Sequence, residues 1–124
     1  MSANKDLVRQ YYDRFGRLDR PAVLSLLADD VEWIEWGSPD GPARHRGTAE
    51  FAKNMNDPPG PGGLQIEVHR LTEEGPVVLA ECTVRVPLDQ GRFLTVHAWD
   101  VFEIEHGKVR RLTAVTALDK RAGE

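Results

Sequence analysis

The sequence predicts an α+β fold in which three N-terminal helices pack on one face of a curved antiparallel sheet. Apolar side chains recur at helical spacing in the first 30 residues, whereas apolar and polar side chains alternate in the last 60. The turns between the alternating segments are short, and short connections join antiparallel neighbours. A bent sheet closed by helices would enclose a cavity. At 124 residues, we expect a single domain over 1–124.

The N-terminal half predicts three helices. The first carries one apolar stripe, formed by Leu7, Val8, Tyr11, Tyr12, Phe15 and Leu18. Asp19 is placed to cap a second short helix, Pro21 suits its first turn, and Asp29-Asp30 is expected to end it. The buried side of this second helix is Val23, Leu24, Leu26 and Leu27. A third helix is expected from Thr48 to Asn56.

The remaining segments predict strands separated by loops. A short strand rich in β-branched and aromatic residues runs from Val31 to Trp36. Residues 37–42 and 57–63 are rich in proline and glycine and are expected to be irregular. Alternating strands then start near Leu64, Val78 and Leu94, and a last strand runs from Lys108 to about Leu118.

Composition argues against several classes of protein. Sixteen Lys+Arg against twenty Asp+Glu give a net charge of −4, which is unlike a dedicated nucleic-acid binder. The single cysteine, Cys82, allows no intramolecular disulfide, and the histidine spacing matches no metal site. No apolar run approaches the roughly 20 residues of a membrane span, and the polar N-terminus has no signal-peptide core. We therefore expect a cytoplasmic protein without metal, cofactor, nucleic-acid or membrane partner.

Asp100 is the most informative residue. On an alternating strand it shares parity with Leu94, Val96, Ala98, Phe102 and Ile104, and is predicted to face the apolar side. An ionised carboxylate there costs several kcal/mol unless it is paired or protonated, and a protonated acid can donate a hydrogen bond to an oxyanion. The alternatives are a core arginine partner, a bulge that turns Asp100 outward, or capping of a nearby backbone.

Glu35 is the second candidate. It shares parity with Val31 and Trp33 and precedes Trp36. A carboxylate between tryptophans is expected to be partly desolvated, which suits a general base that moves a carbon-bound proton. Both faces of this strand are apolar, so parity leaves open a glutamate on the solvent face.

Two further sets of residues have both a functional and a structural interpretation. Tyr11 and Tyr12 lie on the apolar helix stripe, where half-buried side chains with a wet hydroxyl are common. Arg44-His45-Arg46 precedes a predicted helix N-terminus, where backbone N–H groups favour anions. This segment binds a carboxylate or phosphate in one interpretation and is a solvated cationic loop in the other.

With these residues in hand, the chain resembles the NTF2-like superfamily in its SnoaL-like and ketosteroid-isomerase-like branch. The resemblance covers nearly the whole chain, and it rests on Arg9-Gln10-Tyr11, Leu26-Leu27-Ala28-Asp29-Asp30, residues 43–49, Trp99-Asp100-Val101-Phe102 and Gly107-Lys108-Val109. It implies a cone-shaped fold, three helices on a curved antiparallel sheet around a pocket. It is weak evidence for any one activity, because this fold hosts many.

The resemblance also implies catalytic roles. In ketosteroid isomerases a tyrosine of the first helix and a late-strand aspartic acid form an oxyanion hole, and an aspartate five residues after the Asp-Asp pair is the base. These positions hold Tyr11, Asp100 and Glu35 here. The chain departs from the pattern in three ways. Its base is one methylene longer, Trp36 replaces a proline, and Met55 takes the approximate place of a supporting tyrosine.

The expected function is proton transfer next to the carbonyl of an apolar ketone or polyketide-like substrate, of the isomerase or cyclase type. The expected substrate contacts are Trp33, Trp36, Phe51, Met55, Ala98 and Phe102. A non-catalytic binding module for a small apolar ligand and a purely structural domain are the alternatives. The related limonene-type epoxide hydrolases use a last-strand aspartate, and residues 112–115 hold no carboxylate, which argues against that activity.

A homodimer is also expected. Phe93, His97 and Trp99 lie on the strand face opposite the predicted cavity. Large aromatic side chains on an outward face suggest a covered surface. Members of the superfamily often pair through their sheets, so the resemblance implies a homodimer formed through this face.

Overall fold

A computed structural model describes residues 2–37 and 39–119. The helices are α1 (Ala3–Gly16), α2 (Arg20–Leu24) and α3 (Thr48–Lys53), with a short 3-10 turn at Asp89–Gly91. The strands are β1 (Leu27–Trp36), β2 (Ala43–Arg46), β3 (Gln65–Glu74), β4 (Val77–Pro87), β5 (Phe93–Glu105) and β6 (Lys108–Leu118). The α+β class with three helices on a curved sheet is confirmed, and β1 and β2 precede the third helix.

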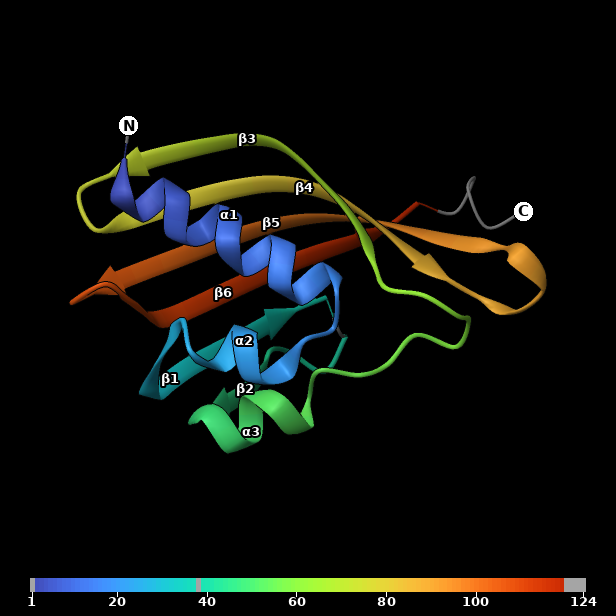
Figure 1. The fold of residues 1–124 in the computed structure, drawn as a ribbon, viewed down its shortest axis with the longest axis horizontal. Coiled ribbons are helices and arrows are strands. Elements are labelled where there is room, and N and C mark those ends of the chain that lie inside the picture. Colours follow the sequence, from blue (N-terminus) through green and yellow to red (C-terminus); the bar gives the residue numbers. More distant parts are fainter. Residues whose placement is uncertain (1, 38, 120–124) are drawn as a thin grey trace.

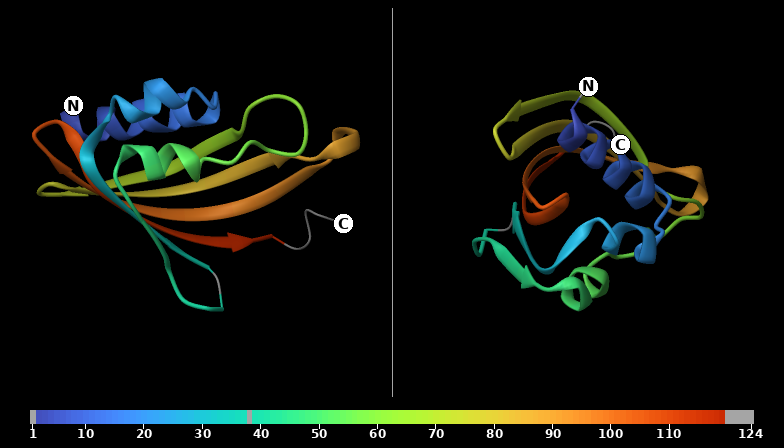
Figure 2. Two further views of the ribbon diagram at one scale, coloured as in Figure 1. Left: turned by 90° about the horizontal axis from the view of Figure 1, so that it is seen from below. Right: turned by 60° about the vertical axis from the view of Figure 1, so that its left-hand side comes forward.

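All six strands form one sheet in the order β2-β1-β6-β5-β4-β3 (Figure 1). Strands β3 to β6 are antiparallel neighbours joined by short turns, as predicted. Strand β1 instead runs parallel to β6, because most of the chain separates the two strands and no tight turn joins them. Figure 2 shows the long strands curving beneath the three helices, which lie over the concave side.

The structure corrects several element boundaries. Helix α2 ends at Leu24, and Asp29-Asp30 lies inside β1, which begins at Leu27 where this residue pairs with Val109. Helix α3 ends at Lys53, three residues before the expected end. Asp19 caps α2 as predicted, since its side chain accepts a hydrogen bond from the Ala22 backbone N–H.

Strand β2 was not predicted at all. Its four residues form an edge strand that pairs antiparallel with β1, and His45 lies opposite Trp33 in the register. The segment Ala43–Arg46 has no alternating apolar pattern, so its strand state comes from pairing with β1 and not from local preference. This pairing brings the basic segment to the side of β1.

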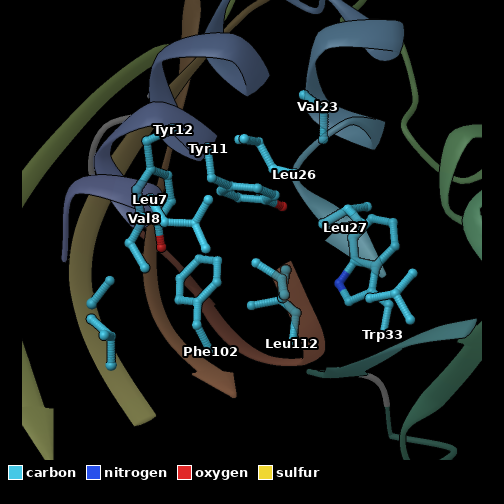
Figure 3. Packing of buried hydrophobic residues seen from close by; sticks show 14 of the residues in the cluster. Leu7, Val8, Tyr11, Tyr12, Val23, Leu26, Leu27, Trp33, Phe102 and Leu112 are labelled. Atoms are coloured by element: carbon cyan, nitrogen blue, oxygen red, sulfur yellow. The ribbon is translucent and has the colours of Figure 1, made fainter. Parts of the chain in front are cut away.

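The core lies between α1 and the concave face of the sheet (Figure 3). Tyr11 packs edge-to-face on Phe102, with the ring centroids 5.1 Å apart, and Trp33 stacks on Phe51 at 4.3 Å. Such aromatic pairs add about 0.5–1.5 kcal/mol each beyond their buried area. Within the residues described, no helix combines the length and apolar character that a membrane crossing needs.

Candidate active site

Two carboxylates share one row across the concave face of the sheet. In the strand register Asp100 of β5 lies opposite Ala114 of β6, and Ala114 lies opposite Glu35 of β1. Residues paired in this way point to the same face of a sheet. Because strands are about 4.8 Å apart, the Cα atoms of Glu35 and Asp100 are separated by about 10 Å, with a methyl side chain between them. The sheet itself therefore places two acids around a small open floor.

A cavity of about 200 Å³ lies over this floor. The concave face carries small side chains here, namely Ala98 and Ala114, whereas the adjacent row carries Phe102, Leu112 and Trp33. The lining residues are Tyr11, Tyr12, Phe15, Trp33, Glu35, Leu64, Ile66, Val84, Val86, Val96, Ala98, Asp100, Leu112, Ala114 and Thr116. Typical sites for drug-sized ligands occupy about 300–1,000 Å³, so this cavity suits a compact molecule.

Asp100 is buried, with 8% of its surface exposed, as its parity predicted. The pKa of its carboxyl group is raised from 3.8 to about 6, chiefly by desolvation, with a smaller lowering by the Tyr12 hydrogen bond and a smaller raising by the charge of Glu35. Within the described chain, the carboxyl group is paired with a tyrosine and not with an arginine. Asp100 thus titrates close to neutral pH.

The adjacent tyrosines of α1 have different contacts. The Tyr12 hydroxyl donates a hydrogen bond of 2.5 Å to Asp100 Oδ2. The Tyr11 hydroxyl forms no hydrogen bond with any residue that the structure describes, although its side chain lines the cavity. Burial raises the pKa of Tyr11 and of Tyr12 well above the usual tyrosine value, so both phenols stay protonated donors. Tyr11 is therefore the donor that a ligand oxygen can use.

Glu35 lies at the border of the cavity. Its side chain is 42% exposed, and its Oε2 atom is 3.0 Å from His45 Nε2. The carboxylate is thus neither fully solvated nor enclosed, and one of its oxygens is occupied by the imidazole. His45 also contacts Trp33, with the ring centroids 5.5 Å apart, which fixes the imidazole against β1. Parity with Val31 and Trp33 left the face of Glu35 open, and the structure places Glu35 on the inward face, where it lines the cavity.

The structure brings together some of the predicted site residues and separates others. Glu35, Tyr11 and Asp100 all line the cavity, as do Trp33 and Ala98. Three expected substrate contacts are buried in the core but are not among the lining residues, namely Phe51, Met55 and Phe102.

Trp36 was expected to contact the substrate, and the structure places it elsewhere. It is 46% exposed and lies on the convex face of the sheet, opposite Val115. Alternation along β1 is the reason, because an inward Glu35 requires an outward Trp36.

Two site residues were missed by the sequence analysis. Tyr12 was considered as a tyrosine of the core stripe, and His45 as part of a segment that either binds an anion or is a solvated loop, whereas the structure pairs them with Asp100 and Glu35. The apolar stripe of the helix includes both Tyr11 and Tyr12, and it does not show which of the two reaches Asp100. Neighbouring residues of a buried helix face differ only in their angle about the helix axis. The alanines at inward positions of β5 and β6, Ala98 and Ala114, were an available signal for a cavity, since small side chains there leave space.

A second, larger hollow adjoins the cavity. This open groove of about 780 Å³ lies between α1, the 61–64 loop and β3, and it shares Tyr12, Leu64 and Ile66 with the inner cavity. The loop approaches α1 closely, and a Cβ atom on Gly63 would collide with the carbonyl oxygen of Gly16. Leu64 then donates a backbone hydrogen bond of 2.8 Å to the same carbonyl, which fixes the wall between the two spaces.

Residues 2–37 and 39–119 contain no cluster of three or more His, Cys, Asp or Glu side chains that could hold a metal ion. The polar groups of the residues that line the cavity are instead two carboxyl groups, two phenols, the Thr116 hydroxyl and an indole N–H. Such groups can hold and move protons and can donate hydrogen bonds to an oxygen of a bound molecule.

Three helices over the concave side of a curved sheet make up the fold of the NTF2-like proteins. The family model for the SnoaL-like domain matches residues 8–112, so the chain belongs to that family. Comparison with curated proteins gave no match.

Solved structures show the same fold. The structure of an M. tuberculosis LEH-like epoxide hydrolase matches with a TM-score of 0.77 and 19% identity, over 98% of this chain and 86% of that chain. A proposed ketosteroid isomerase from Kribbella flavida DSM 17836 matches with a TM-score of 0.73 and 23% identity, over 93% and 78% of the two chains. A proposed SnoaL-like polyketide cyclase from Jannaschia sp. CCS1 matches with a TM-score of 0.76 and 17% identity, over 92% and 85%. At these identities the likeness shows the fold alone.

Proposed function

We propose that this protein is a small-molecule enzyme that transfers a proton next to the carbonyl of an apolar ketone or polyketide-like substrate, as an isomerase or a cyclase. The observation that supports the proposal is the placement of Glu35 and Asp100 on either side of Ala114 in one cavity. Their environments differ, since Asp100 is buried whereas Glu35 is half-exposed and bonded to His45. Two carboxyl groups in unlike surroundings can serve as acid and as base.

The proposed roles follow from these surroundings. Glu35 takes a proton from the carbon next to the carbonyl, and the electrons of the broken C–H bond form an enolate. Tyr11 and protonated Asp100 donate hydrogen bonds to the enolate oxygen as its charge develops. An isomerase would return the proton to another carbon of the same molecule. A cyclase would join the enolate carbon to a second carbonyl carbon and protonate the alkoxide that results.

The acid role of Asp100 predicts a dependence on pH. With a pKa of about 6, the free carboxyl group is largely ionised at pH 7 and protonated at pH 5. A bound apolar molecule would displace water and favour the protonated form further. We therefore expect ketone affinity to fall as the pH rises above about 6, by up to about tenfold per pH unit.

A ligand screen tests the proposal. Conjugated ketones and aromatic polyketides are added to the wild type and to Asp100→Ala at pH 5 and pH 8, and thermal unfolding is recorded. A ligand at 100 times its Kd stabilises the folded state by about 2.7 kcal/mol, which raises the Tm by several degrees. Stabilisation should be larger at pH 5 and absent in Asp100→Ala. Asp13→Ala, an exposed position on α1, is the control. Ligand stabilisation that persists in Asp100→Ala would contradict the proposal.

The second candidate is a non-catalytic binding module for a small apolar ligand. The mostly apolar walls of the cavity favour it, as does the bond from His45, which occupies one oxygen of Glu35. Such a module would bind the same ketones without moving a proton. Loss of proton transfer in a Glu35 variant would favour the enzyme, whereas equal proton exchange with and without the Glu35 carboxylate would favour the binding module.

We also propose that the protein pairs with a second copy through the convex face. Trp36, Val115 and Trp99 are exposed and lie side by side across three strands. Glu81 lies beside Trp99 in the strand register and is paired with Arg70, and Arg111 is paired with Glu32 and Glu103, so the charged groups of this face are neutralised within the chain and the apolar row is free to pack. Light scattering at micromolar concentration should give a dimer, and Trp99→Glu a monomer. A wild-type monomer would contradict this proposal.

The cytoplasmic location likewise stays a proposal, supported by the single thiol Cys82.

A further inference from the structure

Trp33 carries a buried hydrogen-bond donor without a partner. Its side chain is 6% exposed, and among the residues described its Nε1 atom is the one buried side-chain nitrogen or oxygen that has no hydrogen bond. Unpaired buried donors are rare in folded proteins because each loses its bonds to water without replacement. This one belongs to a residue that lines the cavity.

The indole ring is held in a fixed orientation. It stacks on Phe51 of α3 with an interplanar angle of 27°, and its other neighbour is the His45 ring. Figure 3 shows the Trp33 nitrogen directed into the interior from the β1 side, and the Tyr11 hydroxyl directed into the interior from α1. Two unpaired donors thus enter the same space from different elements.

The Asp100 carboxyl group and the Trp33 indole are held on different sides of the cavity. Tyr12 holds the Asp100 carboxyl group toward α1, whereas stacking on Phe51 holds Trp33 toward α3. Trp33 also lies one row away from Asp100, since it pairs with Leu112 and not with Ala114. A ligand that accepts hydrogen bonds both from protonated Asp100 and from the Trp33 indole therefore needs two separate acceptor atoms.

We infer that the Trp33 Nε1–H group donates a hydrogen bond to a second oxygen of the substrate, separate from the carbonyl oxygen that Tyr11 and Asp100 receive. The inference rests on the proposed function and narrows its substrate class. The substrate is a compact ring that carries two oxygen acceptors, such as a diketone or a hydroxyketone. The cavity of about 200 Å³ sets the size, and its apolar walls set the ring character.

Four small ring ketones test the inference by calorimetry at pH 5. Cyclohexanone and 4-methylcyclohexanone offer one oxygen, whereas cyclohexane-1,4-dione and 3-hydroxycyclohexanone offer two at different spacings. The wild type should bind at least one of the two-oxygen ligands about tenfold more tightly than the one-oxygen ligands, because it gains a hydrogen bond and satisfies a buried donor. Methylcyclohexanone controls for added size.

Three variants assign the preference to the indole N–H group. Trp33→Phe removes the donor and keeps an aromatic ring, and Trp99→Phe is the matched control on the convex face. A protein with Trp36→Phe and Trp99→Phe has Trp33 as its single tryptophan, which can be replaced by benzothienylalanine, an isostere with sulfur in place of the N–H group. The preference should persist in Trp99→Phe and vanish in the other two proteins.

Two results would overturn the inference. Equal affinity of the wild type for one-oxygen and two-oxygen ligands would do so, as would a preference that survives the benzothienyl replacement. If cyclohexanone still bound in an Asp100-dependent manner, the proposed function would stand without the second contact. Failure of all four ketones to bind would contradict the proposed function itself and this inference with it.

Discussion

Asp100→Asn is expected to stabilise the folded protein at pH 8 by about 3 kcal/mol and to leave its stability nearly unchanged at pH 4. The pKa of Asp100 rises from 3.8 to about 6 on folding, chiefly by desolvation. A difference of about two pKa units corresponds to about 3 kcal/mol in the free energy of unfolding. Asparagine has the same shape, carries no charge, and can still accept the hydrogen bond from Tyr12.

The direction of the effect follows from proton binding. Between about pH 4 and pH 6 the folded protein retains the Asp100 proton while the unfolded chain loses it, so wild-type stability falls as the pH rises through this interval. Above about pH 6 both states are ionised and the penalty is constant. Urea unfolding of the wild type and Asp100→Asn at each pH from 4 to 8 isolates this contribution. Asp13→Asn, which removes an exposed carboxylate, should change stability by less than about 1 kcal/mol. A stability difference between wild type and Asp100→Asn that does not vary with pH would contradict the burial of an ionisable acid.

Glu35→Gln is expected to abolish proton exchange at the carbon next to a bound carbonyl. A positioned general base contributes about 10²- to 10⁴-fold to such a transfer, so the variant should exchange at least about 100 times more slowly. Glutamine keeps the length of the side chain, and its amide oxygen can still accept the hydrogen bond from His45. Binding of the ketone should therefore survive while exchange is lost.

The exchange is measured in D2O with cyclohex-2-en-1-one, by the loss of its proton signals next to the carbonyl in NMR spectra. Glu67→Gln, at an exposed position of β3, is the matched control and should exchange at the wild-type rate. Glu35→Asp, which withdraws the carboxylate by one methylene, should show an intermediate rate. Equal exchange in the wild type and Glu35→Gln would contradict the enzymatic function and favour the binding module.

Strand alternation made the inward position of Asp100 predictable. The parity argument required only that β5 be regular from Leu94 to Ile104, and the structure has its irregularity at the end of that stretch, between Glu103 and Ile104. The same alternation placed Glu35 beside Val31 and Trp33, but could not choose between two apolar faces. Which face of β1 points inward depends on β6 and β2, which pair with β1 on either side. The alternation of residues within β1 carries no information about these two partner strands.

Contacts between distant segments were not predictable. The hydrogen bond from Tyr12 to Asp100 joins residues 88 positions apart, and nothing in a helix stripe distinguishes Tyr12 from Tyr11 as its donor. Phe51 and Trp33 are both large, buried and aromatic, yet only Trp33 lines the cavity, because α3 holds Phe51 behind it. Residue type predicts burial, whereas the wall on which a side chain lies depends on how the helices pack over the sheet.

The central claim is that a desolvated acid on β5 changes its protonation near neutral pH inside a ligand cavity. Carbon NMR of protein labelled at the aspartate carboxyl groups measures this directly, with Asp100→Asn identifying the signal. The Asp100 signal should titrate with a midpoint at about 6, and Tyr12→Phe should move the midpoint higher, because the Tyr12 hydrogen bond lowers the pKa of Asp100. A midpoint near 3.8, the value of an ordinary aspartate, would contradict the claim.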